Sequence, residues 1–395
     1  MHIDTSERRA RLAIRHHLAP VARAASVDSV ARDLVCLHAT DPASVYLSVW
    51  ARMTDPTISA VEKALYEDRS LVRMLAMRRT MFVVPAEDTS LFHSAASLAI
   101  ARTERPRTEG LVAMLGVPDP AAWLRDAEAA TLAALADRDE AAAQELSKVV
   151  PALREQVLVN AGKKYEGKIG LSSRVLLQLG LEGEVIRGRP RGTWISSQYR
   201  WALTTDWLGR RLEARPEAES RAEVIRRWLA RFGPGTEADL RWWTGWTAGS
   251  VRAALAAIGA VKVDLDGTDA GFVLPGDVEP TPAPEPWVAL LPCLDPTTLG
   301  WKSRGWYLGG HGGQLFDSNG NAGPTIWADS RIVGGWAITF SGRVVTKLLE
   351  DIGTDASRLV EAEAGRLEKW LATTTVVPRF APPLHRELIS EGRQT

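Results

Sequence analysis

Apolar residues recur every three or four positions near the start of the chain, which is the spacing of amphipathic helices. The pattern predicts helices over residues 7–18, 27–37, 44–52 and 58–67. Two shorter apolar runs follow, at 71–78 and 80–85, and the second run ends at Pro85, so we expect two strands there. Helices followed by a two-stranded ribbon are typical of a winged helix.

This succession of helices and ribbon recurs twice along the chain. In the second copy we expect helices over 141–161 and 171–180, and then a strand, a basic turn and a strand over 183–195. In the third copy Thr236 caps a helix, with Asp239 three positions further on. The remaining elements of the third copy are helices at 222–232 and 250–259 and alternating strands at 261–265 and 271–274.

The chain changes character after a segment rich in proline and acid at 276–286. Short β runs separated by glycine-rich turns predict a small antiparallel sheet or barrel, with runs at 288–291, 306–308, 326–327, 332–333 and 336–340. A last amphipathic helix is expected over 350–371, and a loose tail after Pro378.

We therefore predict an α+β fold that is mainly α. Three tandem winged-helix domains would occupy residues 1–118, 119–215 and 216–280. A C-terminal antiparallel β domain with a final helix would occupy residues 285–375. The length of 395 residues alone predicts fewer units, since about 150 residues per domain gives two to three domains.

Composition excludes several classes of protein. With 45% hydrophobic and 24% charged residues, the chain is neither disordered nor fibrous. The two cysteines, Cys36 and Cys293, lie far apart, and no cluster of histidines and acids has the spacing of metal ligands, so we expect neither a metal nor a cofactor. No apolar run approaches the roughly 18 residues that span a bilayer, and the N-terminus lacks a signal peptide. A cytoplasmic protein without a membrane partner is expected.

Charge is balanced overall but uneven along the chain. Lysine plus arginine equals aspartate plus glutamate, 48 each. Residues 163–200 nevertheless carry eight bases against three acids. Arg187, Arg189 and Arg191 alternate, so an extended strand would present all three on one face. Such a stripe suits the phosphates of DNA; the alternative is a solvated hairpin tip.

Several segments together resemble the winged-helix DNA glycosylases of the AlkZ and YcaQ type. The resemblance covers nearly the whole chain and implies tandem winged helices wrapped around double-stranded DNA, with the β domain completing the cleft. It also implies metal-free hydrolysis of the N-glycosidic bond of an alkylated purine; some relatives protect antibiotic producers from their own DNA-alkylating products. The segments are LHATDP (37–42), WAR (50–52), IRGRPRGTW (186–194), SQYRW (197–201), DLRWWTGW (239–246), LDPTT (294–298), GWK (300–302) and NGNAGPTIW (319–327).

The catalytic turn of that family carries Gln-x-Gln or Gln-x-Asp, whereas this chain has His38 and Thr40 at the matching positions. A purine alkylated at N7 or N3 is already cationic and leaves readily, so the enzyme needs a placed water and a stabilised sugar cation. His38, with an ordinary pKa of about 6.5, would accept the proton of that water, and Thr40 would fix it. Asp41 would orient the imidazole or stabilise the sugar; alternatively it caps the next helix.

Other candidate DNA contacts lie further along the chain. Arg200 belongs to one of the shared segments, and Lys302 and Arg304 lie on an expected hairpin between two tryptophans. His311, in a glycine-rich loop, would probe a groove or simply occupy a turn. His16, His17 and His93 are expected on helix surfaces, and the 15 tryptophans mainly in the core.

A second class of function stays open at this stage. A non-catalytic winged-helix DNA-binding protein, such as a regulator, would also lack the usual glutamines. Three unlike winged helices in one chain suit a monomer that encircles a lesion better than a twofold dimer that reads a palindrome. The leading prediction is therefore a monomeric glycosylase acting on bulky alkylpurines such as N7-alkylguanine or N3-alkyladenine.

Overall fold

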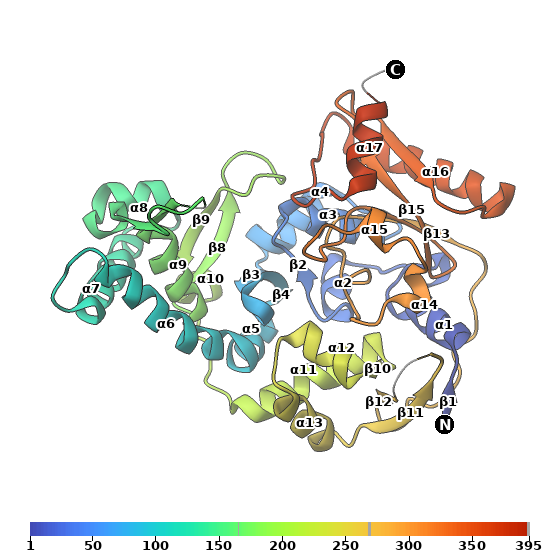
Figure 1. Ribbon diagram of the computed structural model, residues 1–395, viewed down its shortest axis with the longest axis horizontal. Helices are drawn as coiled ribbons and strands as arrows, with labels where there is room; N and C mark the ends of the chain where they lie inside the picture. The colour runs from blue at the N-terminus through green and yellow to red at the C-terminus, as the bar shows by residue number, and fades with distance from the viewer. Residues whose placement is uncertain (165, 268–269, 393–395) are drawn as a thin grey trace.

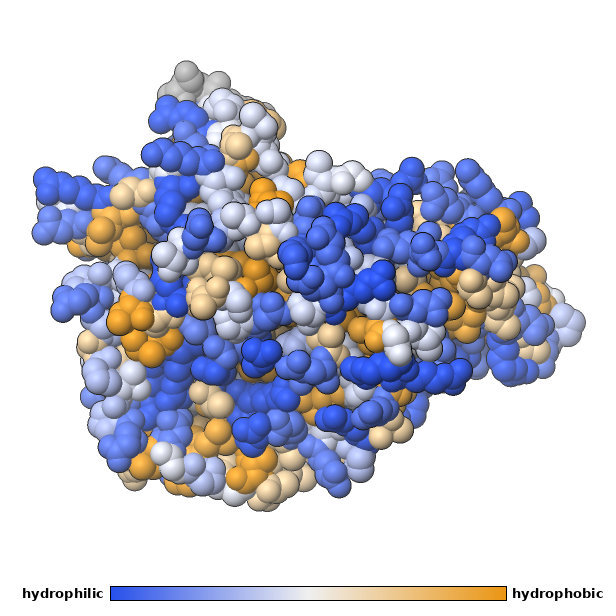
Figure 2. Space-filling view, turned by 180° about the vertical axis from the view of Figure 1, so that it is seen from behind, coloured by the Kyte–Doolittle hydropathy of each residue, from blue (hydrophilic) through white to orange (hydrophobic). Residues whose placement is uncertain are grey.

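The computed structural model describes residues 1–164, 166–267 and 270–392. It is mainly helical, with small sheets whose strands are almost all antiparallel, so the predicted α+β class is confirmed. One lobe, formed by α6 to α10 with β8 and β9, extends to the side of a larger body (Figure 1). The opposite face is covered mainly by hydrophilic residues, among which hydrophobic ones are scattered (Figure 2).

The N-terminal part contains the predicted helices followed by the predicted ribbon. The second helix ends four residues early, at Asp33, because Leu37 and His38 pair with Val83 and Phe82 as a short strand. The elements are β1 (His2–Ile3), α1 (Thr5–Arg15), α2 (Val27–Asp33), β2 (Leu37–His38), α3 (Pro42–Trp50), α4 (Ile58–Glu62), β3 (Leu71–Leu75) and β4 (Met81–Pro85).

The side lobe differs from its prediction in two places. The helix expected over 141–161 breaks, because the residue before Pro151 avoids the helical conformation. The second strand of the wing begins only at Tyr199, beyond the expected 193–195. The elements are α5 (Thr89–Phe92), α6 (Leu98–Ala113), α7 (Pro120–Ala136), β5 (Ala141–Ala142), α8 (Ala143–Val149), β6 (Gln156–Val159), β7 (Gly167–Gly170), α9 (Leu171–Leu181), β8 (Val185–Pro190), β9 (Tyr199–Leu203) and α10 (Thr204–Leu208).

One six-stranded sheet joins these first two parts, in the order β2-β4-β3-β8-β9-β5. The two ribbons meet through antiparallel pairing of Arg73 on β3 with Arg187 on β8. The wing of the side lobe therefore continues the sheet that carries His38, which fixes the position of the lobe relative to the predicted catalytic turn.

The third part follows its prediction closely. Thr236 and Asp239 form the predicted capping box at the start of α12. Its elements are α11 (Glu217–Phe232), β10 (Gly235–Thr236), α12 (Glu237–Thr244), α13 (Ala248–Ala257), β11 (Val261–Leu265) and β12 (Gly271–Val273). The N-terminal strand β1 adds to the edge of this sheet by parallel pairing with β11, so the start of the chain lies against its third part (Figure 1).

The C-terminal part is the predicted antiparallel sheet, in the order β13-β14-β15-β16. Three details of the prediction are wrong. Residues 306–308 are helical, 332–338 belong to one continuous strand, and the tail expected to be loose forms helix α17. The elements are β13 (Val288–Leu291), α14 (Gly305–Leu308), α15 (Gly312–Leu315), β14 (Thr325–Ala328), β15 (Arg331–Ile338), β16 (Val344–Leu348), α16 (Gly353–Leu371) and α17 (Pro383–Glu391).

Candidate active site

His38 lies at the edge of the six-stranded sheet and lines a pocket of about 280 Å³. Its side chain is 8% exposed, and the imidazole packs edge-on against Phe82, with ring centroids 5.1 Å apart. The pocket is assembled from the turn at His38, the tip of the first ribbon, α12 and two loops of the C-terminal part. Its lining residues are His38, Arg78, Thr80, Trp242, Leu299, Lys302, Arg304, Asn319, Gly320 and Asn321.

Three of these lining residues are cations, and among the described residues none of the three has a carboxylate partner. The guanidinium groups of Arg78 and Arg304 each lie over the ring of Trp242, with the central carbon 4.6 Å from the ring centroid in both cases. Lys302 is exposed at the rim. The structure therefore brings the predicted DNA contacts Lys302 and Arg304 to the same pocket as His38.

The imidazole of His38 is neutral in this setting. Burial and the nearby charge of Arg78 lower the pKa of His38 to about 3. Its Nδ1 accepts a long hydrogen bond, 3.4 Å, from the backbone N–H of Thr40. That length is well above the usual 2.9–3.0 Å, so the contact holds the ring only weakly.

Thr40 and Asp41 occupy different environments from His38. The hydroxyl of Thr40 is buried and, among the described residues, has no hydrogen-bond partner. Asp41 caps α3, because one of its carboxylate oxygens accepts the N–H of Ala43 at 3.1 Å and the other accepts the N–H of Arg379 at 2.9 Å. Burial raises the pKa of the Asp41 carboxyl. This geometry is that of a helix cap, the second of the two roles considered for Asp41, and Asp41 does not line the His38 pocket.

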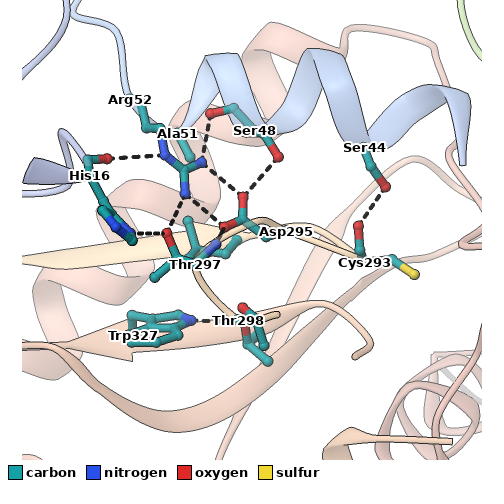
Figure 3. A network of polar contacts seen from close by, with 12 residues as sticks. His16, Ser44, Ser48, Ala51, Arg52, Cys293, Asp295, Thr297, Thr298 and Trp327 are labelled. Carbon is teal, nitrogen blue, oxygen red and sulfur yellow. Dashed lines mark hydrogen bonds and ion pairs between the residues drawn. The ribbon is translucent and has the colours of Figure 1, made fainter. Parts of the chain in front are cut away.

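A buried polar network holds α3, the helix after the turn at His38, against the C-terminal part (Figure 3). The guanidinium of Arg52 donates to both carboxylate oxygens of Asp295, at 2.8 and 2.7 Å, and both side chains are completely buried. Ser48 donates to Asp295, and Arg52 also donates to Thr297. Two of the shared sequence segments, 50–52 and 294–298, are thus direct partners in the fold.

His16 belongs to this network and is fully buried, and His93 is buried elsewhere in the fold, so the prediction of a surface position is wrong for both residues. Its Nδ1 lies 2.8 Å from the hydroxyl of Thr297, and its Nε2 lies 3.2 Å from the carbonyl oxygen of Arg231. Burial, with the charge of Arg52 as a further cause, lowers the pKa of His16 well below its ordinary value. The imidazole therefore serves the core as a neutral hydrogen-bonding group.

Asp239 links the helix that carries Trp242 to the loop that carries Lys302 and Arg304. This buried carboxylate caps α12, which carries Trp242, and also accepts the backbone N–H groups of Lys302 and Ser303, each at 2.9 Å. The capping box was predictable from the local sequence. The bond to a loop 63 residues away was not.

The basic wing of the side lobe lies apart from the His38 pocket. Arg187 is largely covered by the rings of Tyr199 and Trp201, and it lines a second pocket of about 320 Å³ with Arg191. Arg189 lies over Tyr66. The strand is irregular between Arg187 and Pro190, so the three arginines do not share one environment as predicted.

The remaining candidates are held in local contacts. The carboxylates of Glu62 and Glu67 each lie 3.7 Å from the guanidinium of Arg189. Arg200 is half-buried on β9, opposite Ala142. The Nε2 of His311 lies 3.2 Å from the carboxylate of Glu350, and His311 does not line the His38 pocket. These three residues are partly buried, whereas Arg191 is exposed.

Sequence reasoning offered Arg78 only as a DNA contact flanking the first ribbon, and it did not select Trp242, Asn319 or Asn321 as site residues, although these three lie in the shared segments. Arg78 has a left-handed backbone (φ 54°), which is uncommon for a residue other than glycine and often marks a functional position. That signal exists only in the structure.

Two further findings concern metal sites and membrane-spanning helices. Within residues 1–164, 166–267 and 270–392, no group of three or more histidine, cysteine, aspartate or glutamate side chains is placed to hold a metal ion. Over the same ranges, no helix has both the length and the apolar character required to cross a membrane.

The chain is similar to known proteins in both structure and sequence. The structure is similar to a Streptomyces sahachiroi DNA glycosylase, AlkZ, with a TM-score of 0.73 and 20% sequence identity over 96% of this chain and 100% of that one. A search of curated proteins gives no match. The family model described as DNA glycosylase AlkZ-like matches residues 31–370. Since that match spans most of the sequence, the chain belongs to the AlkZ-like family of DNA glycosylases.

Proposed function

We propose that the protein is a monofunctional glycosylase that hydrolyses the bond between C1′ and N9 of bulky alkylated purines in double-stranded DNA, such as N7-alkylguanine or N3-alkyladenine. The observation that carries the proposal is the pocket in which His38 faces three cations without carboxylate partners. A cationic pocket suits the backbone of DNA, and His38 is the group in it that can exchange a proton with water.

The reaction needs little acid catalysis. The alkylated purine already carries a positive charge, so the C1′–N9 bond breaks with both electrons going to N9, which neutralises the leaving base. A water oxygen then bonds to C1′. A water attached to a cationic carbon is a far stronger acid than an imidazolium, so His38 can accept its proton even with a pKa of about 3.

This role requires the tautomer of His38 in which Nε2 carries the lone pair and Nδ1 carries the proton. We infer that the hydroxyl of Thr40 accepts a hydrogen bond from that Nδ1–H. The hydroxyl is buried without a partner, and the backbone nitrogen of the same residue already lies 3.4 Å from Nδ1. The hydrogen bond from Nδ1–H to the hydroxyl replaces the long contact between the backbone N–H of Thr40 and Nδ1. Thr40 then acts as a positioning residue for the imidazole. Asp41 supports the turn as the cap of α3.

The remaining parts of the proposal concern the whole molecule. The wing, through Arg187, Arg189, Arg191 and Arg200, and the loop of His311 would contact the duplex outside the pocket. Winged-helix units over 1–118, 119–215 and 216–280, with the β domain at 285–375, would act as a monomer in the cytoplasm on nucleoid DNA. Protection of a producing cell against its own DNA-alkylating antibiotic is a role that this activity would serve.

A panel of duplexes tests the proposal. Each duplex carries one defined lesion (N7-methylguanine, a bulkier N7-alkylguanine or N3-methyladenine), and abasic sites are scored as alkali-sensitive strand breaks. We expect release of the modified base and one break at the lesion, with none in the undamaged duplex. Tight duplex binding without any base release from the whole panel would instead support a non-catalytic DNA-binding protein.

A further inference from the structure

The charge of the His38 pocket conflicts with the reaction proposed for it. Glycosidic cleavage develops positive charge on the sugar, yet Arg78, Lys302 and Arg304 line the pocket and none of its lining residues is an aspartate or glutamate. Like charges a few ångströms apart repel, most strongly where water is excluded. The described side chains of the pocket would therefore oppose the sugar cation unless an anion occupies the pocket with it.

The one carboxylate in the adjoining loop is already engaged. Oδ1 of Asp317 accepts the backbone N–H groups of Asn319 and Asn321, each at 2.8 Å, and Oδ2 accepts the side-chain amide of Asn321, also at 2.8 Å. These bonds lower the pKa of Asp317 and close its own turn. Its effect is to hold Asn319 and Asn321 at the wall of the pocket.

Aromatic rings hold the two arginines of the pocket in place. Trp242 underlies the guanidinium groups of both Arg78 and Arg304, and Phe316 lies 4.7 Å from that of Arg304. A Cβ atom at Gly245 would lie only 2.9 Å from Cγ of Arg78, so the chain keeps a glycine where this arginine passes. Guanidinium forks fixed in this way are suited to phosphate oxygens.

We propose that this pocket is a subsite for one backbone phosphate next to the damaged nucleotide, and that this phosphate supplies the negative charge which stabilises the sugar cation. The inference rests on the proposed glycosylase function. The nearest anions to the C1′ of a nucleotide in DNA are its own flanking phosphates, and His38 and the three cations share one pocket. The cations hold the phosphate, and the phosphate in turn shields the sugar from the cations.

The test changes the DNA, so that protein folding is not affected. Duplexes with one central N7-methylguanine carry a single neutral methylphosphonate at successive positions of the damaged strand, and base release is measured under single-turnover conditions with saturating protein. We expect one linkage beside the lesion to slow release at least tenfold, and linkages two or more nucleotides away to change it less than threefold.

Variants then assign the linkage to the pocket. Arg304→Gln should slow release from the unmodified backbone and lose most of its sensitivity to the critical linkage, because the two changes remove the same contact. Arg191→Gln, in the second pocket, should weaken binding and keep the full sensitivity. Additive losses with Arg304→Gln would overturn the assignment.

The outcomes separate this inference from the function on which it rests. If the protein releases the base and no single methylphosphonate position slows the release, it is a glycosylase without this subsite. A protein that releases no base from the unmodified backbone refutes both. A third outcome is that inorganic phosphate raises the melting temperature of the wild type but not of Arg304→Gln, while no methylphosphonate position slows release. In that case the pocket binds free phosphate, and its assignment to a DNA phosphate is overturned.

Discussion

Arg52 and Asp295, 243 residues apart, form a two-point ion pair in which neither side chain is exposed. Arg52 ends the segment that begins at the turn of His38, and Asp295 begins the loop that leads to Lys302 and Arg304. Every oxygen and nitrogen of this pair that the structure describes finds a partner, including Ser48, Thr297 and the carbonyl of His16. The pair thus fixes both walls of the His38 pocket relative to each other.

Asp295→Asn should destabilise the protein strongly. The substitution keeps the shape of the side chain but leaves the charge of Arg52 buried without a counterion, for which a loss of about 3–5 kcal/mol in the free energy of unfolding is expected. Denaturant unfolding measures it. Asp355→Asn is the matched control, because the side chain of Asp355 is 96% exposed and its pair with Arg358 is worth little. Equal effects of the two changes would contradict the importance of the buried pair.

His38→Ala should lower the rate of base release about 10²-fold or more, the usual range for losing a proton acceptor. His38→Gln, which restores the residue type of the family that this turn resembles, should retain more activity than His38→Ala. Single-turnover rates on the N7-methylguanine duplex measure both. His2→Ala, at an exposed position, is the control and should be unchanged. If His38→Ala matched the wild type, His38 would have no part in the chemistry.

The rate should also be insensitive to pH near neutrality. With a pKa of about 3, His38 remains neutral from pH 5 to pH 8, so it contributes no inflection near pH 6.5. An acid limb centred near pH 6.5 that disappears in His38→Gln would show that the imidazole titrates normally in the complex.

The same depressed pKa predicts how stability depends on pH. An unfolded histidine has a pKa of about 6.5, so as pH falls the unfolded chain takes up the proton first. The free energy of unfolding is therefore full above pH 6.5 and decreases between pH 6.5 and pH 3, by at most about 1.4 kcal/mol per pH unit for His38. His38→Gln should show a shallower decline in denaturant unfolding series. Identical slopes would contradict the burial of a neutral imidazole.

Arg191→Ala should weaken duplex binding and reduce its dependence on salt. Arg191 is exposed at the wing, and one lost phosphate contact lowers the slope of log K against log salt by about 0.9. Glu155→Ala is a control, because this exposed residue lies outside both pockets. Binding titrations at several salt concentrations measure the slope. An unchanged slope would place the wing outside the interface.

The sequence predicted local features better than long-range ones. The Thr236–Asp239 cap and the first ribbon depend on neighbouring residues, and both are present. The break near Pro151 was also local, but the helical apolar pattern outweighed the proline in the prediction. His16 was misplaced because its partner Thr297 lies 281 residues away.

The candidate site was predictable only in part. The turn with His38 and Thr40 was found through the family resemblance, and Lys302 and Arg304 were selected from an expected hairpin between two tryptophans; both arguments consider one short segment at a time. That Arg78 and Arg304 share the ring of Trp242 follows from the packing of three distant segments, which no local pattern encodes. The absence of a carboxylate in the pocket, on which the phosphate subsite depends, is likewise visible only after the lining residues have been assembled.

Thr40→Val tests how the imidazole is oriented. Valine matches the shape of threonine and lacks the hydroxyl, so the substitution removes the proposed acceptor for the Nδ1–H of His38 without opening a cavity. We expect the single-turnover rate to fall about 10-fold to 100-fold while duplex binding is unchanged, because fewer molecules hold the tautomer whose Nε2 can accept a proton. Thr40→Ser keeps the hydroxyl and should remain within threefold of the wild type.

If Thr40 had a purely structural role, Thr40→Val would lower the free energy of unfolding together with the rate, whereas a positioning role leaves stability intact. The hydroxyl is buried without a partner, so replacing it with a methyl group should leave the free energy of unfolding unchanged or raise it. A slower but equally stable Thr40→Val therefore identifies a positioning residue. In the double variant with His38→Ala, Thr40→Val should cause no further loss, because its effect passes through the imidazole. A further tenfold loss in that background would mean that Thr40 acts on water or DNA directly.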